Sequence, residues 1–290
     1  SNKPTLIAPS MNVKMWENQN TIANVLKLKE QGIHFIGPNK GEMACGEVGY
    51  GKMASVQEIK KEIDYLLKPG ILTGKRALVT SGPTIEQIDP VRFISNNSSG
   101  KQGHAIADAL RRHGADTNLI SGPVNIKDPE NVKVTKVNSA EEMLHECRES
   151  LPVNIAVFAA AVSDWRCSNT SNIKIKKTPE NDELNLNLEK NQDILKEIST
   201  LNKNRPDLVI GFSLETDNLI ETAKEKLKNK SCDWIVANGH YNGKESVFDS
   251  DMNSVKLVEN DNLEDWGYLT KNDVAEKLCI KISKFFNEAA

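Results

Sequence analysis

The residues best suited to chemistry lie in a loop that follows the apolar run at residues 77–80 and precedes a helical pattern ending at Gly114. The loop lacks apolar periodicity over about twenty residues, which is long for a connection without a function. Small and polar residues would let a ligand approach the backbone, supply hydrogen bonds and, with the free N–H groups of the helix start, favour an anion. These residues are Ser95, Asn96, Asn97, Ser98, Ser99, Gly100, Lys101 and Gly103. A long surface loop that only caps a helix is the alternative interpretation.

The elements that must position this loop alternate between strand and helix. Apolar runs predict buried strands at residues 77–80, 118–123, 155–158, 208–212 and 234–237, with an alternating strand at 132–137 and a late hairpin around 255–258. Amphipathic spacing predicts helices at residues 103–113, 139–148, 193–201, 218–230 and 273–287. This alternation predicts an α/β fold with a doubly wound, Rossmann-like parallel sheet, in which ligands bind at the carboxyl ends of the strands.

A domain boundary is expected near residue 70. A helix predicted over residues 55–67, with Ser55 and Glu58 as a capping box, ends at Pro69 and Gly70. Before it, residues 4–9 and 34–36 are expected to form strands and residues 22–31 a helix. We therefore expect one domain in residues 1–70 and a second in residues 71–290.

Composition and charge narrow the class of function. Lys and Arg number 37 against 40 Asp and Glu, and the net charge of −3 argues against a general nucleic-acid binder. No apolar run is long enough to span a membrane. The five cysteines are scattered and form no CxxC motif, so the sequence predicts neither a disulfide framework nor a zinc site and fits a cytoplasmic protein.

Three short motifs in the loop carry a family resemblance. Ser81-Gly82-Pro83-Thr84, Asp89-Pro90-Val91-Arg92 and the Ser-Asn-Asn-Ser-Ser-Gly-Lys run of residues 95–101 closely resemble the signature of bacterial phosphopantothenate–cysteine ligases. Those enzymes are usually the C-terminal half of a bifunctional coenzyme A biosynthesis protein, whose N-terminal half is a flavin-dependent phosphopantothenoylcysteine decarboxylase. The resemblance extends across nearly the whole chain.

The resemblance implies a multifunctional enzyme of coenzyme A biosynthesis. Its ligase would join 4′-phosphopantothenate to L-cysteine through an acyl-cytidylate, consuming CTP and releasing pyrophosphate and CMP. Mg²⁺ would be held mainly through the triphosphate, and no protein nucleophile is needed. The ligase domains of the family form homodimers, and the full-length proteins form larger homo-oligomers. The full-length parent would also decarboxylate the product to 4′-phosphopantetheine.

Residues of the loop gain roles from this resemblance. Asn96 would bind the phosphopantothenate carboxylate and the acyl-nucleotide formed from it, whereas its residue type alone fits a helix cap or a turn amide. Arg92 would hold the carboxylate or phosphate of the substrate. The other residues implied are Ser98, Ser99 and Gly100 for the substrate and Gly82 for the nucleotide.

A second group of motifs resembles the nucleotide site of the family. Small residues after the strand at 155–158 would let a base lie against the backbone, with ordinary packing as the alternative. The segment at residues 190–194, Lys-Asn-Gln-Asp-Ile, is similar to the family's Lys-Asn-Pro-Asp-Ile, and residues 211–216 match a Gly-Phe-x-x-Glu-Thr motif. Lys226 and Lys230 share a helix face, which is ordinarily solvated. The residues implied are Phe158, Ala159, Ala160, Asp164, Asn191, Asp193, Ile194, Phe212, Lys226 and Lys230.

Lysines alternate with isoleucines over residues 172–177, a pattern typical of an edge strand. The family has a Lys-Ile-Lys-Lys motif here, on a flap that closes over the site. By this resemblance Lys174 would neutralise charge on the triphosphate as pyrophosphate leaves. Lys176 is the alternative, because the alternation permits a two-residue shift of the alignment.

The N-terminal residues resemble the end of a flavin-dependent cysteine decarboxylase. Pro9-Ser10-Met11-Asn12-x-x-Met15-Trp16 is similar to its substrate clamp, with Ser10 where the family has Ala, and residues 41–46 are similar to its second motif. Asn12 would hold the substrate carboxylate with Met15 in the same site, and Cys45 would donate a proton to the enethiolate. Without the resemblance, Met15 would be a core residue and Cys45 a structural thiol.

FMN belongs to a complete decarboxylase domain, in which flavin-binding glycines and a catalytic histidine precede the clamp. Residues 1–68 are therefore expected to bind flavin poorly on their own. Two other functions stay open. A dinucleotide-dependent oxidoreductase fits the strand–loop–helix start but lacks a GxGxxG turn, and a non-enzymatic flavoprotein subunit fits the clamp motif.

Overall fold

The computed structural model describes residues 5–43, 46–67, 70–176, 184–215, 218–239, 252–260 and 262–288. It divides into two compact units, Ser1–Gly70 and Ile71–Ala290. Each unit is described by itself below.

The first unit is small. Its elements are β1 (Leu6–Ile7), α1 (Val13–Trp16), α2 (Gln19–Glu30), β2 (His34–Phe35), β3 (Asn39–Glu42), β4 (Val48–Lys52) and α3 (Val56–Leu67). β1 pairs with β2 in parallel, and β3 pairs with β4 antiparallel. The predicted capping box starts α3, because the Glu58 amide donates to Ser55 Oγ (3.3 Å) and the Ser55 amide donates to Glu58 Oε2 (2.6 Å).

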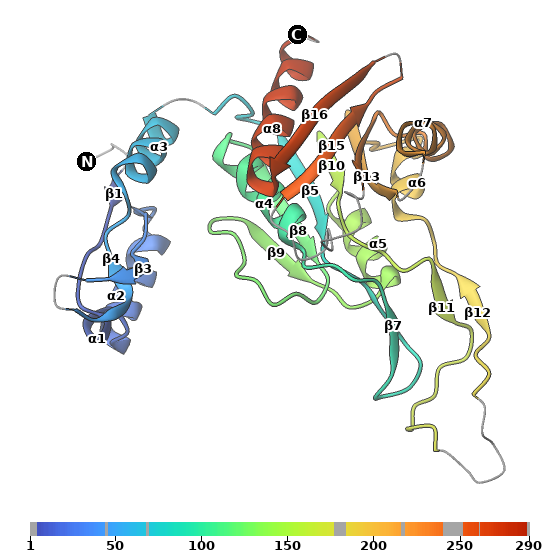
Figure 1. Ribbon diagram of the computed structural model, residues 1–290, viewed down its shortest axis with the longest axis horizontal. Coiled ribbons are helices and arrows are strands. Elements are labelled where there is room, and N and C mark those ends of the chain that lie inside the picture. The colour runs from blue at the N-terminus through green and yellow to red at the C-terminus, as the bar shows by residue number, and fades with distance from the viewer. Residues whose placement is uncertain are drawn as a thin grey trace. The chain divides into compact units, whose positions relative to one another are not determined.

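The second unit is built on a sheet that has eight strands in the described part of the chain, in the order β16-β15-β14-β13-β10-β5-β8-β9 (Figure 1). The six strands from β14 to β9 are parallel, and β15 and β16 add an antiparallel edge. The strands are β5 (Arg76–Ser81), β8 (Asp116–Ser121), β9 (Lys133–Lys136), β10 (Ile155–Phe158), β13 (Leu208–Glu215), β14 (Trp234–Gly239), β15 (Met252–Val258) and β16 (Leu263–Thr270). The predicted doubly wound α/β class is confirmed.

Helices cover both faces of this sheet. α4 (Lys101–Arg112) and α8 (Lys271–Glu288) pack on one face, where Ile106, Leu110 and Leu278 join the core. α5 (Ala140–Glu149), α6 (Ile194–Ser199) and α7 (Leu219–Lys230) pack on the other. The central strands β5 and β10 are buried on both sides, which explains their unbroken apolar runs.

The winding direction changes between β5 and β10. The chain leaves β5 toward β8 and β9 and then returns through α5 to β10 on the opposite side of β5. In open α/β sheets this switch point opens a crevice at the carboxyl ends of the two strands. The motifs around residues 81–103 and 158–165 follow these two strand ends.

The local structure differs from the sequence-based expectations in three places. The long loop contains a hairpin, β6 (Ile85–Gln87) with β7 (Phe93–Ser95), and α4 begins at Lys101 rather than Gly103. Residues 172–176 are irregular rather than an edge strand. They extend from a ribbon of β11 (Trp165–Cys167) and β12 (Leu188–Lys190), which pair antiparallel. We call residues 165–176 and 184–190 the arm (Figure 1).

In the described residues, no helix has both the length and the apolar character needed to cross a bilayer.

Candidate functional site

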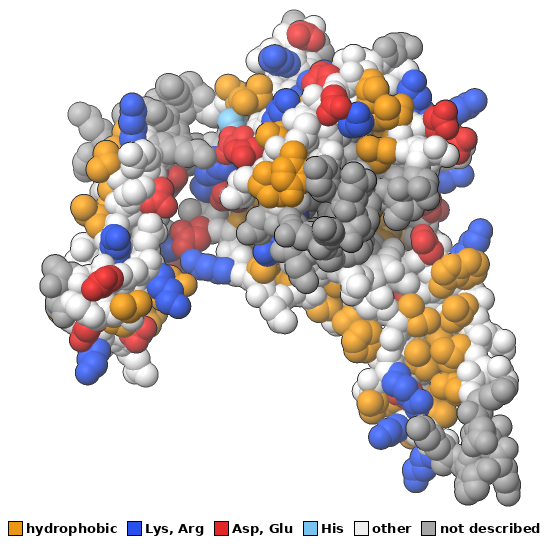
Figure 2. Space-filling view, viewed as in Figure 1, with side chains coloured by type: hydrophobic (Ala, Val, Ile, Leu, Met, Phe, Trp, Pro, Cys, Tyr) orange, Lys and Arg blue, Asp and Glu red, His pale blue; other side chains and the backbone are white. Residues whose placement is uncertain are grey.

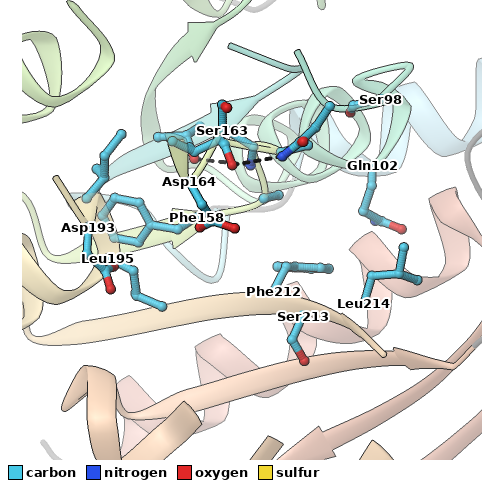
Figure 3. A pocket seen from close by; sticks show the side chains of 18 of the residues that line it. Ser98, Gln102, Phe158, Ser163, Asp164, Asp193, Leu195, Phe212, Ser213 and Leu214 are labelled. Carbon is cyan, nitrogen blue, oxygen red and sulfur yellow. Dashed lines mark hydrogen bonds between the residues drawn. The ribbon is translucent and has the colours of Figure 1, made fainter. Parts of the chain in front are cut away.

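A pocket of about 850 Å³ opens at the carboxyl ends of β5, β10 and β13. Its volume lies in the range of small-molecule sites. Figure 3 shows Phe158, Asp164 and Gln102 on one side of it and Phe212 and Leu214 of β13 on the other. The pocket therefore occupies the switch-point crevice that the winding of the sheet creates.

The start of α4 forms one wall, and we call residues 96–103 the cradle. All eight of its residues line the pocket. Gly100 caps the helix with φ +72°, and a Cβ there would lie 2.7 Å from Val124. A Cβ on Gly103 would lie 2.5 Å from Ser81 Oγ. Only glycine therefore lets β5 and the first turn of α4 approach this closely, with the helix N–H groups directed at the pocket.

Asn96 links the cradle to the segment that follows β10. Its Nδ2 donates to the carbonyl of Val162 at 2.9 Å, across the switch point. Ser98 Oγ accepts from the Gly100 amide at 3.3 Å within the loop. The predicted substrate residues Asn96, Ser98, Ser99 and Gly100 are thus gathered on one wall.

Small residues after β10 form the floor. Phe158, Ala159, Ala160 and Asp164, which the family resemblance implies for the nucleotide, all line the pocket. The Ala160 amide donates to Thr80 Oγ1 (3.3 Å) and the Ala161 amide to the carbonyl of Gly82 (2.8 Å). Gly82 itself does not line the pocket, so it supports the floor from behind.

The start of α6 forms the opposite wall. Asn191 Nδ2 donates to the carbonyl of Ser163 (2.8 Å), while its buried Oδ1 has no hydrogen-bond partner among the described residues. Asp193 caps α6 by accepting from the Lys196 amide, and its second oxygen pairs with Lys230. Asn191, Asp193, Ile194, Lys226 and Lys230 all line the pocket.

Several pocket residues were not predicted. Among them, Ser213 Oγ and Asn238 Oδ1 are buried without a hydrogen-bond partner in the described structure, and Lys271 at the start of α8 is 8% exposed. Ser213 lies on the opposite face of β13 from Phe212 (Figure 3). Ser213 and Asn238 are single polar residues that follow the apolar runs at 208–212 and 234–237, and this position was the available signal. Lys271 is a single basic residue at the start of a helix.

Arg92 and Lys174 do not line the pocket. Asp89 holds Arg92 through Nε (3.0 Å), and the Arg92 Nη2 atom also donates to the carbonyl of Ile175 in the arm (2.7 Å). Burial alone would raise the pKa of Asp89, but hydrogen bonds from the backbone of Val91, from Arg92 and from the Ile175 amide hold it well below its usual range. These bonds join the β6–β7 hairpin to the arm.

Apolar side chains are exposed on the arm and the hairpin beside it (Figure 2). They belong to Val91, Phe93, Trp165, Ile173, Leu184, Leu186 and Leu188. A contiguous apolar surface of this kind marks an interaction site rather than ordinary exposure.

The N-terminal unit holds the remaining predicted residues. Asn12 caps α1 by accepting from the Lys14 amide, and its Nδ2 donates to Glu47 Oε2 at 2.5 Å. Met15 is 61% exposed in this chain, so the alternative of a core methionine is wrong. Cys45 lies outside the described residues.

No group of three or more His, Cys, Asp or Glu side chains in the described residues could hold a metal ion. The pocket instead offers backbone N–H groups at two helix starts, several lysines and two phenylalanine rings. Cations and N–H donors bind phosphates, and aromatic rings bind a planar base. The arrangement can therefore bind a nucleotide and align a second anion beside it.

Comparisons with known proteins agree with this chemistry. Residues 72–286 match the model of the DNA/pantothenate metabolism flavoprotein C-terminal domain, and residues 1–68 match a flavoprotein model. The coenzyme A biosynthesis bifunctional protein CoaBC of Haemophilus influenzae is 42% identical over 259 residues, covering 89% of this chain and 64% of that protein. This chain thus spans less than two thirds of that relative.

Two further matches are a relative named for a different activity and a solved structure. A cysteine/cysteine sulfinic acid decarboxylase from an unknown prokaryotic organism is 39% identical over 287 residues, covering 96% of this chain and 79% of that protein. The crystal structure of the C-terminal domain of a coenzyme A biosynthesis bifunctional protein CoaBC superposes with a TM-score of 0.63 at 33% identity. It covers 76% of this chain and 99% of that domain.

Proposed function

The chain belongs to the DNA/pantothenate metabolism flavoprotein family, whose C-terminal domain it carries in residues 72–286, and from this premise we propose that it is a phosphopantothenate–cysteine ligase of coenzyme A biosynthesis. The ligase would use CTP, form an acyl-cytidylate from 4′-phosphopantothenate, and transfer the acyl group to the amine of L-cysteine. A cytoplasmic location fits this biosynthetic role.

One observation carries the proposal. The pocket combines the cradle with the lysines of α7 at the switch point of the sheet. A ligase of this kind must bring a carboxylate and a triphosphate together, and both are anions. N–H groups and lysines on two sides of the pocket would offset their repulsion.

The mechanism needs alignment more than a reactive side chain. Asn96 would orient the substrate carboxylate for attack on the α-phosphate, because its amide is fixed by the Val162 carbonyl. Lys226 and Lys230 would bind the nucleotide from α7, and Phe212 would lie against the base. The cysteine amine would then displace CMP and form the amide.

Mg²⁺ would reach the pocket on the triphosphate. Asp193 already accepts from the helix start and Lys230, whereas Asp164 is a pocket carboxylate that fits a metal carried by phosphates. The ion would supply charge neutralisation as pyrophosphate leaves.

A homodimer is part of the proposal. Lys174 and Arg92 lie with the exposed apolar side chains of the arm and hairpin, outside the pocket of their own chain. Pairing of two copies would bury that apolar surface. It would also let the arm of one copy carry Lys174 to the pocket of the other, where it could neutralise the triphosphate.

The N-terminal unit supports a second activity in the whole protein. Residues 1–68 match a flavoprotein model, and a relative named as a decarboxylase covers 96% of this chain. We propose that the complete protein binds FMN and decarboxylates the ligase product, with Asn12 holding the carboxylate, Met15 in the same site and Cys45 as proton donor.

A pyrophosphate-release assay tests the ligase. The chain is incubated with 4′-phosphopantothenate and either CTP or ATP, with and without L-cysteine. We expect release with CTP and amide formation only when cysteine is present. Binding of NADPH without pyrophosphate release would support the oxidoreductase alternative, and inertness toward all of these ligands would support a non-enzymatic subunit.

A further inference from the structure

A buried histidine lies directly beneath the cradle. His104 is in the first turn of α4 and is only 6% exposed. Its Nδ1 lies 2.9 Å from Ser81 Oγ and 3.1 Å from the carbonyl oxygen of Gly100. The imidazole therefore contacts the end of β5 and the left-handed residue that starts the cradle helix.

Two neutral tautomers fit the contacts of this group. Ser81 is fully buried, and its Oγ lies 2.8 Å from the Gly100 carbonyl oxygen and 2.9 Å from Nδ1. A hydrogen on Nδ1 leaves Nε2 as an acceptor, whereas a hydrogen on Nε2 leaves Nδ1 to accept from the Ser81 hydroxyl. Protonation of the ring places a hydrogen on both nitrogens.

The other ring nitrogen faces a carboxylate. Nε2 lies 3.4 Å from Asp128 Oδ1, at ion-pairing distance but without hydrogen-bond geometry. Asp128 belongs to the connection between β8 and β9, and it also pairs with Lys136 of β9. Burial lowers the pKa of His104 below its ordinary value, while the Asp128 carboxylate favours the imidazole cation and Lys136 opposes it.

The same connection covers the cradle from outside. Val124 approaches Gly100 and Gly82 so closely that a Cβ at either glycine would lie within 2.8 Å of its Cγ1 atom. A displacement of Asp128 would therefore be transmitted both through His104 and through this packing.

We propose that His104 is a positioning residue of the cradle. It fixes the first turn of α4 through Ser81 and Gly100 and links that turn to Asp128, so that phosphate binding in the pocket depends on the charge of the imidazole. This inference rests on the proposed function only in naming CTP as the phosphate ligand. Protonation leaves a donor on both ring nitrogens, toward Ser81 and toward Asp128, and places a positive charge beneath an anion site, so it favours binding at lower pH.

The cluster is not a hydrolytic triad. A serine hydrolase directs Nε2 at an exposed serine and Nδ1 at the acid. Here Nδ1 faces the serine, and Ser81 is fully buried, so a substrate cannot reach its hydroxyl.

Four variants of the chain test the proposal. His104→Phe keeps a planar ring but removes both nitrogens, whereas His104→Asn retains an N–H near the position of Nδ1 and cannot titrate. Asp128→Asn removes the facing charge. His145→Phe, at an exposed site on α5, is the matched control. Calorimetry measures binding of CTP and of inorganic tripolyphosphate from pH 5.5 to 8, and thermal unfolding checks that each variant is folded.

We expect His104→Phe to weaken binding of both ligands about ten-fold, the size of one lost buried hydrogen bond. His104→Asn should recover most of this loss at pH 8, but its affinity relative to the unaltered chain should fall as the pH falls. Dividing the affinity of the variant by that of the unaltered chain at each pH cancels the effect of phosphate titration on binding. Asp128→Asn should lower the pKa of His104 followed by NMR, and His145→Phe should change nothing.

Unchanged tripolyphosphate binding in folded His104→Phe, or a pH-independent ratio for His104→Asn, would overturn the positioning role. Failure of the unaltered chain to bind tripolyphosphate would overturn it too. A chain that binds tripolyphosphate through His104 but releases no pyrophosphate from CTP and phosphopantothenate would refute the ligase and leave the positioning role intact.

Discussion

Replacing Asn96 by Asp changes a single atom group on the cradle wall of the pocket. The Nδ2 donor that holds the Val162 carbonyl at 2.9 Å becomes a carboxylate oxygen, and a negative charge enters the cradle. The substitution therefore removes one hydrogen bond and adds repulsion toward phosphate. The side chains of Asn and Asp have nearly the same shape, so the fold should be kept.

The two effects can be sized separately. Loss of the bond costs about 1 kcal/mol. Repulsion between the new carboxylate and one phosphate charge about 4 Å away costs about 1 kcal/mol in water and more where water is excluded. Because Asn96 is exposed, the water value applies. A total of about 2 kcal/mol corresponds to a roughly 30-fold loss in pyrophosphate release.

Two control variants separate the terms. Asn96→Leu removes the bond without adding charge, and Asn97→Asp adds charge to the same pocket wall without removing the Val162 bond. Each should cost about five-fold, which corresponds to about 1 kcal/mol. The assay is pyrophosphate release from CTP and 4′-phosphopantothenate, with circular dichroism as a check on folding. Near-normal activity of Asn96→Asp would refute the role of Asn96, and a full effect of Asn97→Asp would show that charge alone matters.

Three further outcomes are expected. Lys174→Gln should slow cytidylate formation more than cysteine capture, as measured by rapid quench. If the lysine acts on the partner's pocket, mixing Lys174→Gln chains with Asn96→Asp chains should restore activity in about a quarter of the sites. Equal slowing of both steps would contradict the role of Lys174, and no recovery on mixing would contradict its action on the partner. Because the folded-state pKa of Asp89 is depressed, its contribution to stability is present above its unfolded value near pH 4 and is lost as the pH falls through the folded one. Asp89→Asn should therefore lower the urea midpoint at pH 7, and this deficit should shrink as the pH falls below 4, whereas an equal deficit at pH 7 and pH 3 would count against the assignment. Burial raises the pKa of Cys232 to about 12 and that of Cys147 further, so iodoacetamide should modify both thiols slowly at pH 8 in the native chain and rapidly in urea, as mass spectrometry would measure.

The central sheet could be read from the sequence because its signals are local. The runs at residues 77–79 and 155–158 are apolar at every position, and both strands are buried on both faces. The β6–β7 hairpin was missed for the opposite reason. Three-residue strands carry almost no periodicity, and backbone pairing rather than side-chain pattern defines them.

The start of α4 shows how backbone geometry moves a boundary. A helical pattern beginning at Gly103 underestimates the helix because Gly100 adopts φ +72° and ends the loop three residues earlier. The sequence shows a glycine at both positions. Only the close approach of Val124 to one and Ser81 to the other distinguishes their tasks.

The predicted site residues that line the pocket also differ from those that do not in whether a local sequence signal fixes their position. Residues next to strand ends or helix starts, such as Phe158 and Asp193, reach the pocket because the sheet places those ends together. Arg92 and Lys174 belong to segments whose direction depends on the hairpin and arm, and Asp89 binds the two segments to each other. No spacing rule encodes such a connection. A basic side chain in a recognisable motif can therefore be needed by the reaction and still lie outside the pocket of its own chain. The exposed apolar side chains around Arg92 and Lys174 are the reason to expect that a second copy of the chain brings these residues to the pocket.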